Sequence, residues 1–456
     1  MRVAPGLPLF ATLALAAVFL LATTPGFIVQ DTWIALVAGR EIVQHGLPSH
    51  EHLTILAAGR RWVDQQWLGQ LFMYALALGG GIKLVVLTCE AAALSAWGLA
   101  IAAAGRRGPP APAVVTILVA VGILSSPWGL QVRTQELALP LFAALLWLLL
   151  TDPLLVQRRT ISALAVLVVW ANVHGSAVLG VGVVLAYALA ACRTAPRRRL
   201  LPYLATPLTL LASPYAAGLP GYYHLMVVSP PFRRYIYEWQ PSRPSLTTAI
   251  FYVLAVVAVA VVLRRRRVYH PGEIVILVLT LASAAWAIRN IVWFALAAAA
   301  ILPARERGEA FRSAPAGVVA IAMACVIPVS AGLALAKPPT YWQGRASDRA
   351  AVALAPLVEK KGSVFADDAH ADWLLWRFPE LRGRIVYDDR VELLRSGQLR
   401  MLQRALYGRS DALGACLVVV SPELARHFGG QPAWRDRTTA VIEKHSARCD
   451  RNRASS

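Results

Sequence analysis

The sequence predicts an all-α, polytopic membrane bundle of about eleven transmembrane helices, followed by a small C-terminal α/β domain outside the cytoplasm. Three observations support this fold class. Of the 456 residues, 57% are hydrophobic and only 15% are charged, whereas a soluble chain of this size has about 25% charged residues. Many apolar runs reach or approach the roughly 20 residues that cross a bilayer. After residue 337 the composition becomes that of an ordinary soluble domain.

The predicted crossings follow from the apolar runs. A soluble helical core would need a polar face on each helix, and these runs have none. Because some runs are short, the number of crossings is uncertain by about two. The first run exceeds the roughly 7–15 apolar residues of a signal peptide, so we expect it to be retained. The runs are residues 7–29, 82–104, 112–127, 135–151, 160–172, 175–192, 199–212, 246–263, 271–287, 290–303 and 315–336.

The net charge of +20 comes mainly from arginines in short gaps between the apolar runs. If the N-terminus is cytoplasmic, all of these clusters fall on the inner side, as the positive-inside rule requires. The loop 30–81 and the polar tail then lie outside. No basic stripe is interleaved with aromatic residues, which argues against nucleic acid as a partner. The clusters are Arg106–Arg107, Arg158–Arg159, Arg193 with Arg197–Arg199, Arg264–Arg267, and Arg305 with Arg307 and Arg312.

These patterns predict the domain organisation. We expect a transmembrane domain over residues 1–337 with a first outer loop at 30–81, an extracytoplasmic α/β domain over 338–445, and a disordered end over 446–456. In the outer loop, residues 31–45 and 67–78 are expected to be helical, the second helix ending at Gly79–Gly81. These three glycines separate it from the next crossing.

The tail has short elements of both kinds. Strands are predicted at Ser363–Ala366, Ile385–Tyr387 and Cys416–Val420, and helices at Ala369–Arg377 and Pro422–His427, an order typical of a small α/β domain. Two of the five cysteines, at positions 416 and 449, lie in this tail. They could pair if the tail is extracytoplasmic, but the sequence leaves this open.

Short motifs spread over most of the chain resemble a known family. They are Asp31–Trp33, Gly39–Ile42, Gly46–Pro48, Arg61–Val63, Trp67–Leu68, Arg133–Gln135, Trp170–Gly175, Ser213–Tyr215, Glu238–Pro241, Val364–Phe365 and Asp388–Arg390. In this order they resemble bacterial polytopic proteins of the glycosyltransferase C type, a group that includes protein O-mannosyltransferases and oligosaccharyltransferase. The resemblance is closest to a largely uncharacterised branch of that group. It implies a helix bundle, an essential acidic residue in the first outer loop and a lipid-linked sugar donor.

Two departures from the family pattern stand out. Relatives often have an acidic residue, a phenylalanine and a serine after the proline of the first loop, where this chain has Ser49–Thr54. Relatives also tend to have more than one acidic residue near the end of the first helix, whereas Asp31 stands alone there.

Sugar transfer from a polyprenyl phosphate needs a base for the acceptor hydroxyl, positive charge or hydrogen-bond donors at the departing phosphate, and a groove for the lipid. With the resemblance, Asp31 is the candidate base. Its alternative role is to cap the helix that follows, since aspartate is favoured at that position by about 1 kcal/mol.

Residues at other outer helix ends are candidates for phosphate binding. Arg133 with Gln135, and Arg289 between two apolar runs, could hold a phosphate. Arg133 could instead pair with Glu136 three residues later. Asn172 and His174 lie in a short outer turn, where they could bind phosphate or only meet lipid headgroups.

The first outer loop offers secondary candidates, namely Glu51, Asp64 and Trp67. Its carboxylates and its histidines could bind a divalent metal ion together with Asp31, but their spacing is not specific and a solvated loop is the simpler interpretation. The acidic residues of the tail are interpreted as strand-end turns. They are Asp367, Asp368, Asp388 and Asp389, beside Arg390.

The predicted function is that of a multi-pass glycosyltransferase of the bacterial plasma membrane. It would move a sugar from a polyprenyl-phosphate donor to a cell-envelope glycan, lipid or protein, with membrane lipids as further partners. Its acid and cationic groups are expected to converge in one pocket. The alternatives are an inactive scaffold of the same fold and a lipid or polysaccharide transporter, which would need broken helices at the membrane midplane.

Overall fold

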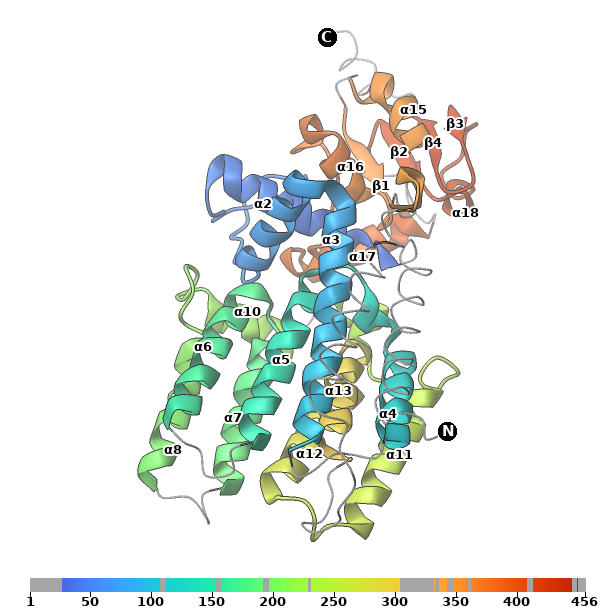
Figure 1. The fold of residues 1–456 in the computed structure, drawn as a ribbon. Coiled ribbons are helices and arrows are strands. Elements are labelled where there is room, and N and C mark those ends of the chain that lie inside the picture. Colours follow the sequence, from blue (N-terminus) through green and yellow to red (C-terminus); the bar gives the residue numbers. More distant parts are fainter. Residues whose placement is uncertain are drawn as a thin grey trace. The chain divides into compact units, whose positions relative to one another are not determined.

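The computed structural model describes residues 27–106, 112–151, 157–191, 197–228, 231–303, 332, 336–342, 348–359, 362–407, 413–444 and 449. They form two compact units (Figure 1). The helical unit contains residues 86–219 and 237–336, and the mixed unit contains residues 24–85, 220–236 and 337–456. Residues of the first outer loop and of the tail therefore belong to the same unit. The expected boundary at 337 stays a prediction.

The helical unit follows the apolar runs closely. The run 199–212 forms two short helices instead of one, separated at Ala205, because Pro207 lacks the N–H that helix continuation needs. The elements are the later part of α3 (Trp67–Ala104), α4 (Pro112–Ser125), η1 (Pro127–Leu130), α5 (Thr134–Thr151), α6 (Gln157–Val173), α7 (Ala177–Ala191), α8 (Arg197–Leu204), α9 (Thr206–Thr209), η4 (Tyr237–Trp239), α11 (Ala249–Arg264), α12 (Pro271–Trp286), η5 (Ile288–Asn290) and α13 (Ile291–Ile301).

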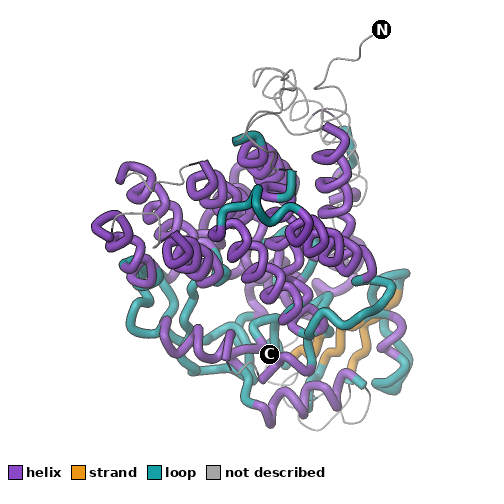
Figure 2. The backbone as a smooth tube through the Cα atoms, turned by 90° about the horizontal axis from the view of Figure 1, so that it is seen from below, coloured by secondary structure: helices purple, strands orange, loops and turns teal. Residues whose placement is uncertain are grey.

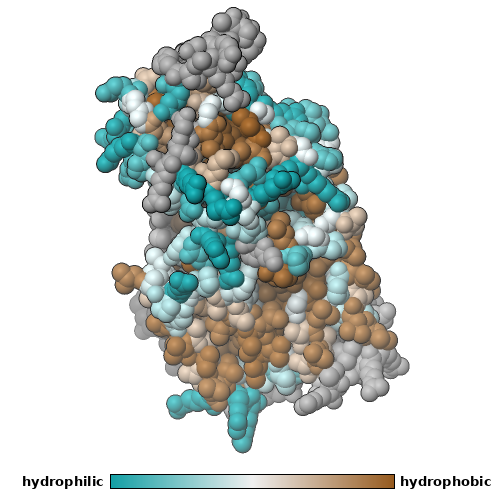
Figure 3. All heavy atoms as spheres, turned by 180° about the vertical axis from the view of Figure 1, so that it is seen from behind, coloured by the Kyte–Doolittle hydropathy of each residue, from teal (hydrophilic) through white to brown (hydrophobic). Residues whose placement is uncertain are grey.

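The core of the helical unit is aromatic. Phe142, Trp170 and Trp293, from α5, α6 and α13, are fully buried, with ring centroids 5.3–5.9 Å apart. On α11, by contrast, large apolar side chains are exposed. Val256 is 68% exposed and Leu263 is 69% exposed. Figure 3 shows hydrophobic residues gathered over the helical part of the visible face. Large apolar faces left open to the surroundings are typical of contact with lipid.

The count of eleven crossings is not confirmed. Among the described residues, two helices are long and apolar enough to cross a membrane, α3 and α5. Six further apolar helices are shorter, in the segments 114–125, 159–173, 177–191, 249–264, 271–286 and 288–301. Most of the predicted crossing 7–29 and nearly all of 315–336 lie outside the described residues.

The mixed unit combines short helices with one small sheet. Figure 2 shows its strands grouped together among helices. The elements are α2 (Gln30–His45), the start of α3, α10 (Leu219–Tyr223), η2 (His224–Val228), η3 (Pro231–Arg234), η6 (Pro339–Trp342), α15 (Asp348–Val358), β1 (Val364–Ala366), α16 (Ala371–Arg377), η7 (Pro379–Leu381), η8 (Val391–Leu393), α17 (Ser396–Leu406), β2 (Leu417–Val420), α18 (Pro422–Ala425), β3 (Trp434–Arg435) and β4 (Ala440–Glu443).

The sheet has the strand order β1-β2-β4-β3, with β1 and β2 parallel and the other pairs antiparallel. The predicted strand Ile385–Tyr387 is wrong. Ile385 makes only isolated bridges, one to Val364 and one to Thr54. The segment lies between β1 and the first outer loop, whose Ile55 N–H donates to the Ile385 carbonyl at 2.8 Å, but the pairing on each side extends over a single bridge only.

Side chains also fasten the first outer loop to the tail. The Arg40 guanidinium on α2 donates to the carbonyls of Leu375 and Trp376 at 2.6 and 3.0 Å, and Arg382 lies 2.9 Å from Glu41. The break predicted after residue 78 is present as a kink at Gly80 and Gly81 inside α3. The positive φ of 66° at Gly81 is the kind of backbone that glycine adopts without strain.

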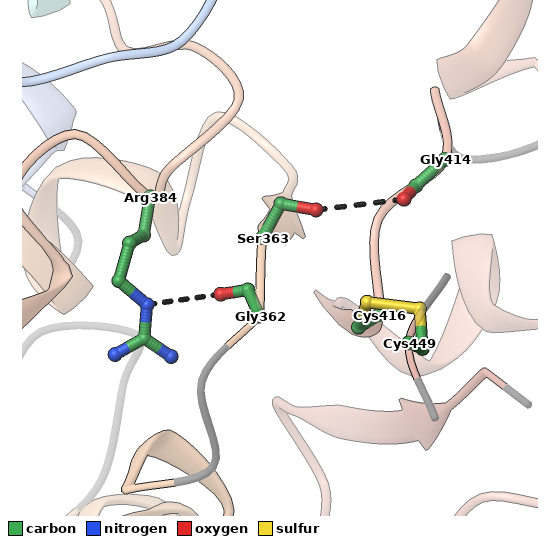
Figure 4. Close-up of a disulfide and its surroundings, with 6 residues drawn as sticks. All are labelled: Gly362, Ser363, Arg384, Gly414, Cys416 and Cys449. Carbon is green, nitrogen blue, oxygen red and sulfur yellow. Dashed lines mark hydrogen bonds between the residues drawn. A yellow bond between two sulfur atoms is a disulfide. The ribbon is translucent and has the colours of Figure 1, made fainter. Parts of the chain in front are cut away.

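The two tail cysteines are joined. Figure 4 shows the disulfide between Cys416 and Cys449, whose Cα atoms are 5.4 Å apart. Nearby, the Ser363 hydroxyl donates to the Gly414 carbonyl and the Arg384 Nε donates to the Gly362 carbonyl. The bond ties the segment after β4 to the start of β2. It resolves the pairing that the sequence left open.

Candidate active site

Asp31 lies in the first turn of α2 and is half-buried. The helix begins one residue earlier than predicted and its N-cap is Val29, so Asp31 is not the cap. An acidic side chain in the first helical turn is still stabilised by the helix dipole. Its carboxyl group is near that of Asp389 from the tail, with which it forms a side-chain hydrogen bond.

Asp372 completes this acidic cluster from α16, which packs against α2. It is 1% exposed, and its Oδ2 accepts the Asp389 backbone N–H at 3.2 Å, while its Oδ1 is buried and has no hydrogen-bond partner among the described residues. Burial, followed by the charge of Asp31 and the hydrogen bond to it, holds the pKa of Asp389 well above its usual range. The raised pKa favours the protonated form of Asp389 beside Asp31, as in other paired carboxyls.

Arg390 is the buried cation beside the cluster. Its guanidinium bonds the carboxylate of Asp388, lies 2.5 Å from Glu51 Oε2, and stacks over Trp62 with 4.2 Å to the ring centroid. Glu51 is fully buried and also accepts the N–H groups of Leu53 and Thr54 at 2.7 and 2.8 Å. The Glu51 carboxylate is therefore used in fixing the first loop to the tail.

Asp64 is a second buried acid close to Arg390. It is 2% exposed, and burial raises its pKa to about 7 despite the attraction of Arg390. The backbone carbonyl of Asp64 accepts the backbone N–H of Trp67 at 3.3 Å. The two secondary candidates Asp64 and Trp67 therefore both lie at the start of α3. Within the described ranges, no group of three or more histidine, cysteine or acidic side chains is arranged to hold a metal ion. The first-loop carboxylates and histidines therefore do not fit the metal site suggested for the loop. The chemistry proposed below for Asp31 uses no metal ion.

We expect the Asp64→Asn variant to be more stable than the wild type at alkaline pH. A raised pKa means that the fold binds the Asp64 proton more tightly than the unfolded chain does. That stabilisation is complete below about pH 4 and is lost as the pH rises through about 7. The gain in unfolding free energy above that pH is on the order of 4 kcal/mol at most.

Thermal melting of the purified protein at acidic and alkaline pH would measure this. The two melting temperatures should agree near pH 4 and separate as the pH rises. The exposed Asp348 provides a matched control, and Asp348→Asn should leave the melting temperature unchanged at both acidic and alkaline pH. A constant difference between wild type and Asp64→Asn across the whole pH range would contradict the assignment.

The helical unit holds the predicted phosphate-binding arginines. The Arg133 guanidinium is buried, with 2.8 Å to Glu238 and 3.0 Å to the Trp128 carbonyl. Glu136 accepts the backbone N–H of Arg133 at 3.1 Å, while the guanidinium pairs with Glu238. These contacts favour a structural role for Arg133.

Arg289 has different surroundings. It is half-buried on η5, stacks over Trp239 with 4.8 Å to the ring centroid, and donates to Gln135 Oε1 at 3.2 Å. Gln135 in turn donates to the Arg289 carbonyl at 3.4 Å, so these two predicted residues are brought together. A planar guanidinium that stacks on a ring presents its N–H donors in the fork geometry that suits a phosphate.

Asn172 and His174 lie at the end of α6. The Asn172 amide donates to the Val168 and Ala212 carbonyls at 2.9 and 2.8 Å, which links α6 to the segment after α9. The His174 Nδ1 lies 2.7 Å from the Ser176 hydroxyl, which also accepts the Trp170 indole N–H at 3.0 Å. These contacts shape the turn, and a role for either residue in phosphate binding stays a prediction.

Sequence reasoning missed the second half of the acidic cluster. Asp388, Asp389 and Arg390 were interpreted as a strand-end turn, and Asp372 was not considered. The one available signal was the family resemblance, which included Asp388–Arg390. The structure shows that the tail supplies the additional acids that are absent from the sequence around Asp31.

The chain thus has a helical unit and a small α/β unit, and acidic side chains gather at the start of α2. These features can be compared with those of known proteins. No protein-family model and no curated protein matches the sequence. Solved structures do match, at low sequence identity.

One is ArnT from Cupriavidus metallidurans bound to undecaprenyl phosphate, with 13% identity, a TM-score of 0.50, and coverage of 98% of this chain and 99% of that chain. Another is the archaeal oligosaccharyltransferase AglB from Archaeoglobus fulgidus in complex with an inhibitory peptide and a dolichol-phosphate. It has 10% identity, a TM-score of 0.56, and coverage of 92% of this chain and 69% of that chain. At such identities the likeness shows the fold alone. It supports the glycosyltransferase C-like fold that the motifs predicted, since oligosaccharyltransferase belongs to that group.

Proposed function

We propose that this protein is a membrane glycosyltransferase that moves a sugar from a polyprenyl-phosphate donor to an acceptor outside the cytoplasm. The observation that carries the proposal is the hydrogen-bonded pair Asp31–Asp389, which places two carboxyl groups together and raises the pKa of Asp389. The fold supports it, because the two structural neighbours were solved with undecaprenyl phosphate and with dolichol-phosphate. The sugar and the acceptor are left unspecified.

In the proposed reaction Asp31 is the general base. Its carboxylate takes the proton from the acceptor hydroxyl or amine while that atom forms a bond to the anomeric carbon of the sugar. The bond between this carbon and the phosphate oxygen breaks, and the electron pair leaves with polyprenyl phosphate. The protonated Asp389 donates a hydrogen bond to Asp31, which keeps the base oriented and prevents a second negative charge beside it.

Arg289 is proposed to bind the donor phosphate. We expect Arg289→Gln to raise the KM for the donor by roughly tenfold to a hundredfold, because a hydrogen bond to a charged group contributes about 1.5–3 kcal/mol. The acceptor KM should change little. The exposed Arg243 offers a matched control in the same unit, and Arg243→Gln should behave as wild type. An unchanged donor KM in Arg289→Gln would remove Arg289 from the donor site.

Localisation is part of the proposal. The open apolar face of α11 supports a place in the membrane. The Cys416–Cys449 disulfide supports an extracytoplasmic tail, because disulfides persist in oxidising compartments and are rare in the cytosol. The N-terminus would then be cytoplasmic and the protein multi-pass.

The test is a transfer assay with purified protein in lipid vesicles. Radiolabelled polyprenyl-phosphate sugars and a cell-envelope extract are added, and free polyprenyl phosphate and labelled product are quantified. The proposal expects both to appear together. Donor that crosses the vesicle membrane without being consumed would indicate a transporter. If every donor stays intact and in place, the chain is a scaffold and the proposal is wrong.

A further inference from the structure

The mixed unit contains a cavity of about 730 Å³ that none of the proposed chemistry uses. Its polar floor is made by residues that directly follow the parallel strands β1 and β2. Asp367 and His370 come after β1, and Ser421 comes after β2. In open α/β sheets, ligands bind in the crevice outside the carboxyl ends of neighbouring parallel strands. The volume falls within the range of about 300–1,000 Å³ that is typical of small-molecule sites.

The floor of this cavity is rigid. Asp367 Oδ1 lies 2.5 Å from His370 Nδ1, and His370 Nε2 lies 2.9 Å from the Thr439 hydroxyl. The other oxygen of Asp367 accepts the Ser421 N–H at 2.7 Å. Both Asp367 and His370 are more than nine-tenths buried. Although burial opposes it, the hydrogen bonds and charge of His370 lower the pKa of Asp367, so its carboxylate is ionised.

The opposite wall is apolar and comes from α17 and η3. Leu399, Leu402 and Phe232 form it, and Tyr407 and Gln403 extend it toward the surface. Tyr407 is 63% exposed, so its ring is available to a ligand. One wall therefore offers hydrocarbon, an aromatic face and the Gln403 amide, while Asp367 and His370 on the floor already bond to each other, to Ser421 and to Thr439.

The charges around the cavity decide between ligand classes. Asp367 and Glu423 contribute carboxylates, Arg435 and Arg437 contribute guanidinium groups, and burial raises the pKa of Asp368. The ionised carboxylate on the floor disfavours a phosphate or another anion there. The arginines disfavour a cation. A near balance of charge, with donors, acceptors and an aromatic face, fits a ligand that has many hydroxyl groups and apolar ring faces, which is a saccharide.

We propose that this cavity binds a neutral oligosaccharide segment of about two or three rings. Calling this segment part of the acceptor rests on the proposed function, while its binding does not. Asp368 joins the two sites, because it lines the cavity, accepts the Tyr387 hydroxyl at 2.7 Å and interacts electrostatically with Asp389.

The test is isothermal titration calorimetry of the full-length protein in detergent, without donor. The probes are maltotriose, cellotriose and N,N′,N″-triacetylchitotriose, with glucose 6-phosphate and an apolar decapeptide as comparisons. We expect at least one trisaccharide to bind. Tyr407→Ala and Gln403→Ala should each raise its Kd by roughly fivefold, as expected for losing one stacking or hydrogen-bonding contact. Met401 lies on the same helix but does not line the cavity, so Met401→Ala should leave the Kd unchanged.

Three results would overturn the inference. They are absence of binding by all three trisaccharides at millimolar concentration, binding that both cavity variants retain in full, and tighter binding of the phosphate or the peptide than of any saccharide. Each can be separated from failure of the proposed function, because the measurement involves no turnover. A protein that binds a trisaccharide but transfers no sugar would keep this site and lose the transferase assignment.

Discussion

Asp31→Asn is expected to lower the rate of sugar transfer by about 10²–10⁴-fold, the range that general base catalysis contributes. The amide keeps the shape of the side chain but cannot accept the acceptor's proton. The KM for the donor should change little, because Asp31 acts on the acceptor. Transfer rates at saturating donor, measured for wild type and variant in the same vesicles, give the comparison.

Two variants of Asp389, whose carboxyl group pairs with that of Asp31, serve as controls for this result. Asp389→Asn keeps a hydrogen-bond donor beside Asp31 and should retain most of the activity at neutral pH, whereas Asp389→Ala removes the donor and should lose much of it. Full transfer by Asp31→Asn would remove Asp31 from the mechanism. Equal loss in both Asp389 variants would show that the carboxyl of Asp389 has a role other than donating a hydrogen bond.

Arg390→Met is expected to destabilise the mixed unit by about 3–5 kcal/mol, because removing one partner of a buried ion pair leaves the other charge uncompensated. Both Asp388 and Glu51 would lose their cation, and the stacking on Trp62 would be lost as well. Thermal unfolding of the purified protein would show a large fall in Tm. Pairing the substitution with Glu51→Gln should recover part of the loss, since one buried charge is then removed.

The matched control is Arg382, whose side chain is 35% exposed in its pair with Glu41. Glu41 in this pair is only 10% exposed but also lies 3.3 Å from His45, so Arg382→Gln should lower the Tm less than Arg390→Met. Similar shifts for Arg390→Met and Arg382→Gln would mean that the buried network contributes no more than a surface pair.

The helical elements could be predicted because hydrophobic length and glycine or proline breaks act locally along the chain. The kink at Gly80–Gly81 and the bounds of α12 illustrate this. The strand predicted at Ile385–Tyr387 is not formed, although its residues have the composition of a strand. Its backbone makes only single bridges, one to β1 and one to the first outer loop. Such pairing depends on segments far apart in sequence, and no local pattern records it.

The candidate site was half predictable for the same reason. Asp31 stands out because it follows the first apolar run, but only the family resemblance makes it a candidate base rather than a helix cap, and its role stays a prediction. Asp389 and Asp372 lie in the tail, and only the packing of α16 on α2 brings them to Asp31. Burial then changes their chemistry, since the pKa of an aspartate that looks like a turn residue in the sequence is raised in the fold. Neither the contact nor the burial can be read from residue types.

The pH dependence of sugar transfer, compared between wild type and Asp389→Asn, tests most directly whether Asp31 and Asp389 act as one proton-sharing pair. The wild-type rate should fall at low pH, where Asp31 gains a proton, and fall again at high pH, where the raised pKa of Asp389 is finally exceeded. In Asp389→Asn the acidic limb should remain and the alkaline limb should disappear, because an amide does not ionise. Superimposable profiles for the two proteins would contradict the account.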